Sequence, residues 1–315
     1  MDQAPRVPGF DRQRPSAHEL RRTLRTLLAT GHPVVMPGCT DALGARLIEQ
    51  AGFEVAYATG AGLANAQFGL PDIGLISQSE VADHLGRLTA AVDLPIIVDA
   101  DTGYGGPIAT MRTVTLFERA GAAGIQLEDQ EMPKRCGHFD DHTLIPAEHM
   151  QAKIAAAAQA RTDGDLVLIA RTDARSAYGS IDEAIRRAKL YVGAGADVIF
   201  VEAPRTVDEL RLVGQELTGV PLLVNVVEGG RTPQLSLTEY ADLGFNLALF
   251  ANFLMRAMHH AGRSALAHLA ERGETIGYAD RIATWEERQA LFHLPEFTAA
   301  EAHFDRVDVD GRETR

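Results

Sequence analysis

Acidic side chains recur just after short apolar segments in the first half of the chain. Asp99 and Asp101 end the segment "LPIIVDAD", Glu128 ends "GIQLE", and Asp72 lies in the loop "GLPDIG". Carboxylates gathered at one edge repel one another unless a cation neutralises them, and their hard oxygen ligands suit Mg²⁺ or Mn²⁺. These four acids are therefore candidate metal ligands, although each of them could instead cap the helix that follows.

The elements that must position these acids are eight short apolar segments that alternate with helical patterns. Continuous β-branched or Leu-rich segments are typical of strands buried on both faces. Their alternation with helices predicts an α/β fold, a closed (β/α)8 (TIM) barrel, and leaves an open doubly wound sheet as the alternative. The expected strands are residues 33–37, 54–59, 94–100, 124–129, 166–172, 197–203, 221–226 and 246–251. Chemistry in a barrel lies at the carboxyl ends of its strands, where this chain also places Tyr57, Thr59, Arg171, Glu202 and Asn225.

The two ends of the chain predict additions to a single barrel domain that spans residues 1–315. We expect a flexible arm at residues 1–15, an extra amphipathic helix at 17–30 and a helical extension from about 270 to 315. The extension carries Trp285, Phe292 and Phe297, so it needs a surface to cover on its own barrel or on a neighbouring subunit.

Bulk composition excludes several classes of partner. The formal net charge is −13, which disfavours nucleic acid and anionic membrane surfaces. No apolar segment approaches the ~20 residues of a membrane helix, and the N-terminus lacks a secretory signal. The two cysteines, Cys39 and Cys136, do not form a disulfide framework, which favours a reducing cytoplasm. Cys39 follows the first strand, and we expect it to be structural.

Several motifs together resemble one known family. The segments "VDADTGYG", "EDQEMPKRCGH", "YATGAGLANAQFGLPDIGL" and "NVVEGGRTP" are similar to the isocitrate lyase/phosphoenolpyruvate mutase superfamily, in particular to short lyases of the 2-methylisocitrate and 2,3-dimethylmalate kind. The resemblance covers about residues 20–300, and its most specific motif is Lys134-Arg135-Cys136-Gly137-His138. It implies Mg²⁺-dependent retro-aldol (retro-Claisen) cleavage of a 2-hydroxy di- or tricarboxylate to a 2-oxo acid such as pyruvate plus a carboxylate. It also implies a homotetramer, a dimer of dimers, in which the last barrel helix is swapped between subunits.

The resemblance also implies roles for individual residues. Asp101 would bind the metal directly, and Asp99, Glu128 and Asp72 would bind it through water. Tyr57 would lie near the reacting oxygen of the substrate and is a candidate to help remove its proton. The remaining positions would bind substrate or assist catalysis: Thr59, Gly60, Ala61, Gly137, Arg171, Glu202 and Asn225 for binding, and Lys134, His138 and Arg171 for catalysis.

Cys136 is the expected proton donor of the implied reaction. Cleavage leaves an enediolate that must be protonated at carbon, and a thiol with a pKa of about 8.5 is largely protonated near neutral pH. Lys134, Arg135 and His138 would lower that pKa and make the thiol a better acid. The alternative is an inert buried cysteine, which the polar sequence around it disfavours. The loop at residues 129–145 is long, and we expect it to open and close over the substrate.

Other activities remain open on the same fold. Hydrolysis or decarboxylation of oxaloacetate needs only a few changes in the pocket, and a phosphonopyruvate or carboxyphosphonate mutase is disfavoured by Cys136. A non-enzymatic binding protein is disfavoured because the acids, Arg171 and the cysteine motif are all present. The strand-eight edge at Phe250 and Ala251 departs from the Tyr-Pro of methylisocitrate-type relatives, so the arm of the substrate stays undetermined.

Overall fold

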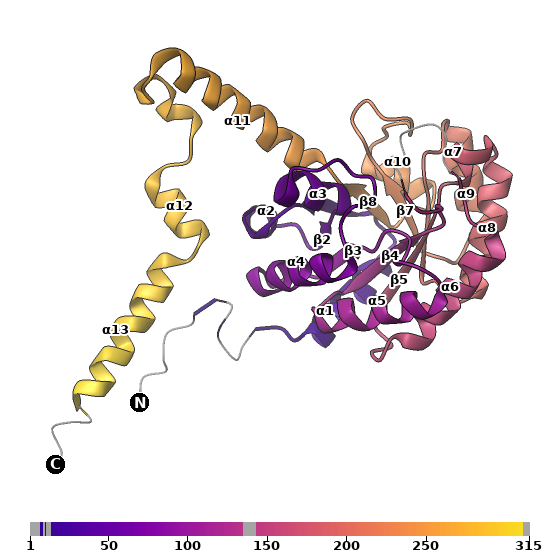
Figure 1. Ribbon diagram of the computed structural model, residues 1–315, viewed down its shortest axis with the longest axis horizontal. Helices are drawn as coiled ribbons and strands as arrows, with labels where there is room; N and C mark the ends of the chain where they lie inside the picture. Colours follow the sequence, from indigo (N-terminus) through magenta and orange to yellow (C-terminus); the bar gives the residue numbers. More distant parts are fainter. Residues whose placement is uncertain (1–6, 9, 11–13, 135–142, 311–315) are drawn as a thin grey trace. The chain divides into compact units, whose positions relative to one another are not determined.

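Eight parallel strands close into a barrel in the computed structural model, which describes residues 7, 8, 10, 14–134 and 143–310 (Figure 1). Each strand pairs with the next along the chain, and β8 returns to β1 with Val34 opposite Leu247. The predicted closed barrel is confirmed, and the open doubly wound alternative is wrong. The strands are β1 (Val34–Cys39), β2 (Ala56–Ala58), β3 (Ile96–Asp99), β4 (Gly124–Glu128), β5 (Val167–Thr172), β6 (Val198–Val201), β7 (Leu222–Asn225) and β8 (Leu247–Phe250).

Helices follow every strand, and side-chain caps define where most of them begin. Asp41 accepts a hydrogen bond from the Gly44 amide, and Ser77 and Glu80 form a reciprocal capping box. Such caps satisfy amides that have no partner within the helix, so they fix each helix start in the sequence. The helices between the strands are α2 (Ala42–Gln50), α3 (Gly60–Phe68), α4 (Gln78–Ala91), α5 (Pro107–Arg119), α6 (Ala147–Ala160), α7 (Ala174–Tyr178), α8 (Ile181–Gly193), α9 (Val207–Glu216) and α10 (Leu237–Asp242).

Two apolar layers hold the barrel together. The interior layer contains buried side chains from most of the strands, among them Met36, Ile97 and Leu223. The outer layer lies between the strands and the surrounding helices and includes Leu85 and Phe117. Since strand residues alternate between these layers, the polar residues at the strand ends are the ones left to face the barrel mouth.

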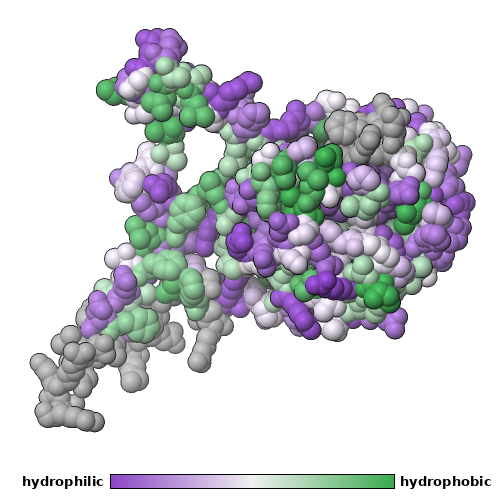
Figure 2. Space-filling model, in the orientation of Figure 1, coloured by the Kyte–Doolittle hydropathy of each residue, from purple (hydrophilic) through white to green (hydrophobic). Residues whose placement is uncertain are grey.

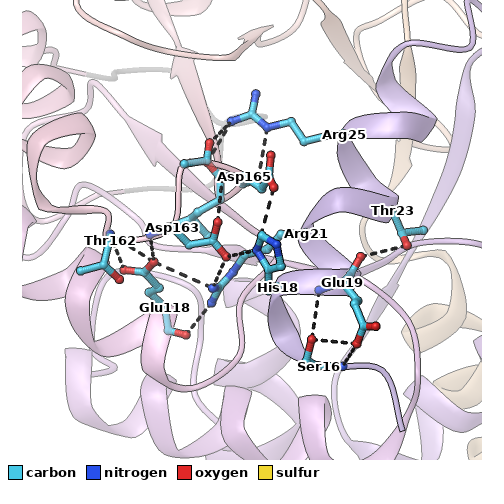
Figure 3. A network of polar contacts seen from close by, with 12 residues as sticks. Ser16, His18, Glu19, Arg21, Thr23, Arg25, Glu118, Thr162, Asp163 and Asp165 are labelled. Carbon is cyan, nitrogen blue, oxygen red and sulfur yellow. Dashed lines mark hydrogen bonds and ion pairs between the residues drawn. The ribbon is translucent and has the colours of Figure 1, made fainter. Parts of the chain in front are cut away.

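Helix α1 (Ala17–Leu28) packs at the end of the barrel opposite the rim acids. Its Leu24 is fully buried in the interior layer. Its Arg21 donates to the Ala122 and Glu118 carbonyls and pairs with Asp163 at 2.8 Å (Figure 3). The pKa of Asp163 is lowered to about 2: burial raises it, but hydrogen bonds from Arg21, the Asp165 amide and His18 outweigh that effect.

His18, Asp163 and Asp165 lie close enough together to resemble a metal site. However, the Asp163 oxygen that faces His18 also accepts from Arg21, so its charge is already neutralised. This group therefore serves to attach α1 to the loop before β5.

By its contacts the chain divides into two compact units, residues 16–256 and residues 1–15 with 257–315. The second unit includes most of α11 (Phe253–Arg272), then η1 (Ile276–Arg281), α12 (Trp285–Leu291) and α13 (Leu294–Asp310). Figure 2 shows hydrophobic side chains exposed along these C-terminal helices, and Ile276 and Trp285 are 86% and 66% exposed. The single-domain organisation stays a prediction, and most of the arm at residues 1–15 lies outside the described residues. Among those described, no helix has the length and apolar character to cross a membrane.

Candidate active site

Asp99 and Asp101 reach the barrel mouth through a tight turn at the end of β3. The backbone at Asp101 has a positive φ of 47°, and its amide donates to Asp99 Oδ1 at 3.0 Å. A Cβ atom at Gly60 would lie 2.9 Å from Asp99 Oδ2 and 3.4 Å from Asp101 Oδ1. Both carboxylates therefore point at the start of α3, and glycine at position 60 leaves them room.

Lys134 inserts its ammonium group into this acidic cluster. Its Nζ pairs with Asp101 Oδ1 at 2.8 Å and also contacts Asp72, and the side chain is 4% exposed. Burial disfavours the charged lysine, but Asp101, Asp99, Glu128 and Asp72 raise its pKa well above the usual value. The ammonium group stays charged and holds the Asp72 loop against the end of β3.

Arg171 is surrounded by acids rather than left open to solvent. Its Nε and Nη2 donate to the two oxygens of Asp173 at 2.9 and 2.8 Å, and Nη1 lies 3.3 Å from Glu202. Nε lies 3.5 Å from Glu128, and the guanidinium stacks over Phe200 at 5.0 Å. The bidentate partner of Arg171 is therefore Asp173 in this structure, a pairing that the sequence did not reveal.

Tyr57 is buried and keeps its proton. Its hydroxyl donates to Gln126 Oε1 at 2.8 Å, and Gln126 Nε2 lies 3.5 Å from Asp99 Oδ1. Burial, followed by the Asp99 charge, raises the pKa of Tyr57 well above its ordinary value. A phenolate is therefore unavailable near neutral pH, which argues against Tyr57 as a general base.

Asp129 is a buried hub that sequence reasoning missed. Its carboxylate accepts hydrogen bonds from Thr172 Oγ1 at 2.7 Å, the Asp173 amide at 3.0 Å, Arg187 Nη1 at 3.1 Å and Tyr191 Oη at 2.8 Å. Successive strand residues face opposite sides of the sheet, so Glu128 faces the mouth and Asp129 faces the helices. That alternation is the signal that could have identified it.

Asp129 also joins the two stems of the loop that carries Lys134. The Ile145 amide donates to the Asp129 carbonyl at 3.0 Å, and Arg187 donates to the Ile145 carbonyl at 3.0 Å. Glu131 donates to Thr143 at 2.8 Å one step further along the loop. The hub therefore connects the loop stems with Asp173, and through Asp173 with Arg171.

A cavity of about 70 Å³ lies among these residues. It brings together most of the positions expected from sequence, and four further residues complete its wall. The lining residues are Tyr57, Thr59, Ala61, Asp72, Asp99, Glu128, Lys134, Arg171, Glu202, Asn225, Val227, Leu249, Ala251 and Asn252. Gly60 and Asp101 line a smaller adjoining chamber. Arg135, Cys136, Gly137 and His138 lie outside the described residues.

The donor set fits a hard divalent cation. Burial raises the pKa of Asp101 to about 6, with Lys134 opposing that shift and Asp99 adding to it. Burial likewise raises the pKa of Glu128 well above its usual value, and its Oε1 has no hydrogen-bond partner among the described residues. Oxygen ligands that are buried and mutually repulsive gain from added positive charge, as Mg²⁺ or Mn²⁺ would provide.

Comparison with known proteins agrees with this geometry. The family model of phosphoenolpyruvate phosphomutase matches residues 24–270. The chain belongs to the phosphoenolpyruvate mutase/isocitrate lyase superfamily.

Its relatives within the superfamily include named lyases. The chain is 41% identical to the petal death protein of Dianthus caryophyllus over 285 residues, which are 90% of this chain and 89% of that protein. It is 38% identical to 2,3-dimethylmalate lyase of Eubacterium barkeri over 89% of this chain and 96% of the relative. It is 40% identical to 2-methylisocitrate lyase of Aeropyrum pernix, with 90% of each chain covered. The chain is thus an enzyme of the lyase type, as predicted.

Solved structures of the superfamily share the whole fold. A crystal structure of 2,3-dimethylmalate lyase matches with a TM-score of 0.84 and 35% identity, covering 92% of this chain and 95% of that one. Oxaloacetate acetylhydrolase in complex with 3,3-difluorooxalacetate matches with a TM-score of 0.81 and 32% identity, covering 94% of this chain and 98% of that one. Phosphonopyruvate hydrolase in complex with oxalate and Mg²⁺ matches with a TM-score of 0.81 and 30% identity, covering 91% of this chain and 99% of that one. The named activities differ among these relatives, so the likeness establishes the superfamily and not the substrate.

Proposed function

We propose that this enzyme is a Mg²⁺-dependent carbon–carbon lyase acting on a 2-hydroxy di- or tricarboxylate of the 2-alkylmalate or 2-methylisocitrate type. The products would be a 2-oxo acid such as pyruvate and a second carboxylate. One observation carries the proposal: buried carboxylates at the barrel mouth outnumber Lys134 and Arg171, the cations of the cavity described above. A further positive charge at these acids would favour the entry of an anionic substrate.

The acids at the end of β3 and β4 are the proposed metal ligands. We expect Asp101 to bind the cation directly, and Asp99, Glu128 and Asp72 to bind it through water. The cation, when bound, supplies a Lewis acid for negative charge on a substrate oxygen. Lys134 pairs with both Asp72 and Asp101 in the structure. Once a cation neutralises these acids, the ammonium group is available to a carboxylate of the substrate.

Substrate carboxylates have two further binding groups in the described cavity. Thr59 caps α3 by accepting from the Gly62 amide at 3.3 Å, so the N-terminus of this helix, with Gly60 and Ala61, opens at the cavity. Helix N-termini favour anions because their amides lack partners within the helix. Arg171 adds charge from the opposite wall, where Asp173 holds it in a fixed orientation.

One residue, Cys136, is assigned to proton transfer in this proposal. Tyr57 is a binding residue in this proposal, because its proton is committed to Gln126. Cys136, outside the described residues, is the proposed acid that protonates the carbon left after cleavage. Asn225 and Glu202, which lie 3.3 Å apart, complete the wall that faces Arg171.

The test is product analysis with a panel of acids. The purified enzyme would be incubated with Mg²⁺ and 2-alkylmalates, 2-methylisocitrate or oxaloacetate, and products would be identified by NMR. We expect a 2-oxo acid and a carboxylate in equal amounts from one of the 2-hydroxy acids. Cys136→Ser should lower turnover by about 100-fold or more, the range for loss of a general acid, while Cys39→Ser, a buried thiol elsewhere, should not. Full activity of Cys136→Ser would refute the assignment of Cys136 as the proton donor.

Oxaloacetate hydrolysis is the second candidate, since the likeness to oxaloacetate acetylhydrolase covers nearly all of the chain. Formation of oxalate and acetate from oxaloacetate, with no cleavage of any 2-hydroxy acid, would establish the hydrolase activity. Pyruvate and CO₂ from oxaloacetate would instead indicate decarboxylation.

We also propose a homotetramer in which α11 packs on a neighbouring barrel. No residue of α11 is buried in the single chain, and Leu266 is 67% exposed. The barrel unit carries an apolar pocket of about 330 Å³ that needs a cover. Its lining residues are Val35, Pro37, Leu47, Ile48, Ala51, Phe53, Glu228, Phe250, Phe253 and Leu254. Light scattering should give four chains for the wild type and fewer for Leu266→Glu; a wild-type monomer would refute the swap.

A further inference from the structure

Tyr104 occupies a backbone conformation that a bulky residue rarely adopts. Its φ is +58°, and it lies between Gly103 at +82° and Gly105 at +145° in the turn after β3. Glycine or asparagine would take this conformation with little strain, whereas a tyrosine there is an outlier that the surrounding structure must hold in place. The side chain of Tyr104 therefore needs an explanation that the turn itself does not supply.

Packing accounts for the ring of Tyr104 but not for its hydroxyl. The ring meets Phe117 edge to face, with centroids 6.4 Å apart and planes at 77°. A phenylalanine would make the same contact. The Tyr104 hydroxyl is buried and has no hydrogen-bond partner among the residues that the structure describes. A buried hydroxyl without a partner is unfavourable, so the oxygen is where a function is to be sought.

Tyr104 lines the small chamber that the proposed metal ligands Asp72, Asp99 and Asp101 also line. This chamber has a volume of about 10 Å³, which is roughly the room that one water molecule needs. Its polar wall consists of Asp72, Asp99, Asp101 and Tyr104, and its apolar wall includes Leu63, Ala64, Ile76 and Val81. A single water here would have several oxygen partners on the polar wall and none on the apolar wall.

The charges around the hydroxyl determine which hydrogen bonds it can make. Burial raises the pKa of Tyr104 well above its usual value, and the Asp101 and Asp99 charges raise it further. The group therefore stays a neutral phenol, with an oxygen that accepts and a proton that donates. A water polarised by a cation is a strong donor, so it needs acceptors, and the neutral phenol supplies one without adding charge.

We propose that Tyr104 is a positioning residue of the metal centre, whose hydroxyl oxygen accepts a hydrogen bond from a water in the hydration shell of the cation. The inference rests on the proposed function, in which Asp101 holds that cation. Asp72 and Asp99, which line the same chamber, would accept further hydrogen bonds from water bound to the cation. The strained turn then has a purpose, since it places Tyr104 at the chamber that Asp72, Asp99 and Asp101 also line.

The test removes one oxygen atom and measures Mg²⁺ binding to the resting full-length enzyme. Isothermal titration should show Tyr104→Phe binding Mg²⁺ about threefold to tenfold more weakly than the wild type, the usual effect of one hydrogen bond. The metal-free melting temperature of Tyr104→Phe should be unchanged or higher, because the variant no longer buries an unpartnered hydroxyl. Tyr240→Phe is the matched control: the Tyr240 hydroxyl donates to Pro233 at 2.8 Å, away from the acids. This control should lower the melting temperature and leave Mg²⁺ affinity intact.

The outcomes separate this inference from the proposed function. Equal Mg²⁺ affinities for wild type and Tyr104→Phe would overturn the role of the hydroxyl while leaving the metal site in place. A lower melting temperature of metal-free Tyr104→Phe with unchanged affinity would assign the hydroxyl to structure alone. Absence of Mg²⁺ binding by the wild type would overturn both proposals.

Discussion

Replacing Asp129 with asparagine should reduce both stability and catalysis, because one buried carboxylate serves both. The substitution keeps the size of the side chain but removes its charge and turns one acceptor into a donor. Arg187, whose side chain is 4% exposed, would lose its buried partner. Removing one member of a buried ion pair costs about 3–5 kcal/mol. Arg187 keeps Glu183 at 3.0 Å, so we expect the lower end, about 3 kcal/mol.

This loss is measurable by thermal denaturation. For a domain of this size each kcal/mol shifts the midpoint by about 2–4 °C, so Asp129→Asn should melt about 6–12 °C lower. The catalytic effect comes through Asp173, whose amide donates to Asp129 and whose carboxylate holds Arg171. Slight misplacement of Arg171 should lower kcat/KM by tenfold or more, equivalent to ~1.4 kcal/mol.

A second substitution separates the two effects of Asp129. The double variant Asp129→Asn/Arg187→Met no longer buries an unpaired charge, so it should regain much of the lost stability. It should not regain kcat/KM, because the hold on Asp173 is still missing. A wild-type melting temperature and wild-type kinetics for Asp129→Asn would refute the role of Asp129 as a hub. Recovery of kcat/KM in the double variant would show that Asp129 affects catalysis only through the stability of the fold.

Three further substitutions test other parts of the account. Burial lowers the pKa of His84 to about 4, so protonation of this histidine favours the unfolded chain. The free energy of unfolding should be highest above pH 6.5 and fall by up to about 3 kcal/mol as the pH is lowered towards 4, and His84→Phe should reduce this pH dependence in urea titrations. Arg21→Met should lower the unfolding free energy by about 2–3 kcal/mol, because Asp163 and the Ala122 and Glu118 carbonyls each lose the hydrogen bond from this guanidinium. An unchanged denaturation midpoint would argue against this anchor of α1. Burial raises the pKa of Cys39 to about 12, so iodoacetamide should label Cys39 only in the unfolded protein, and rapid labelling of native Cys136→Ser would contradict its burial.

The barrel could be predicted from the sequence because its signals are local. Each strand appears as a continuous apolar segment, and most of the following helices start at a side-chain cap such as Ser77 with Glu80. The α3 helix has no comparable signal, because its "GAGLANAQF" has small residues and almost no amphipathic pattern. The five-residue α7 is too short to show a period.

Among the described residues, the sequence could predict which side chains meet at the candidate site but not how they pair with one another. Residues at the carboxyl ends of strands must meet at the barrel mouth, so the order of residues along the chain is enough to group Asp99, Glu128 and Arg171. The partner of each side chain depends on distances across the mouth, which sequence does not carry. The Arg171 and Asp173 pair and the Tyr104 chamber became visible only in three dimensions.

The most direct test of the proposed metal-dependent lyase is turnover as a function of free Mg²⁺, with wild type and Asp101→Asn compared under the same conditions. We expect EDTA to abolish release of the 2-oxo acid, added Mg²⁺ or Mn²⁺ to restore it, and Asp101→Asn to stay inactive at Mg²⁺ concentrations that saturate the wild type. Full turnover of metal-stripped enzyme, or a wild-type Mg²⁺ response in Asp101→Asn, would contradict the assignment of the barrel-mouth acids.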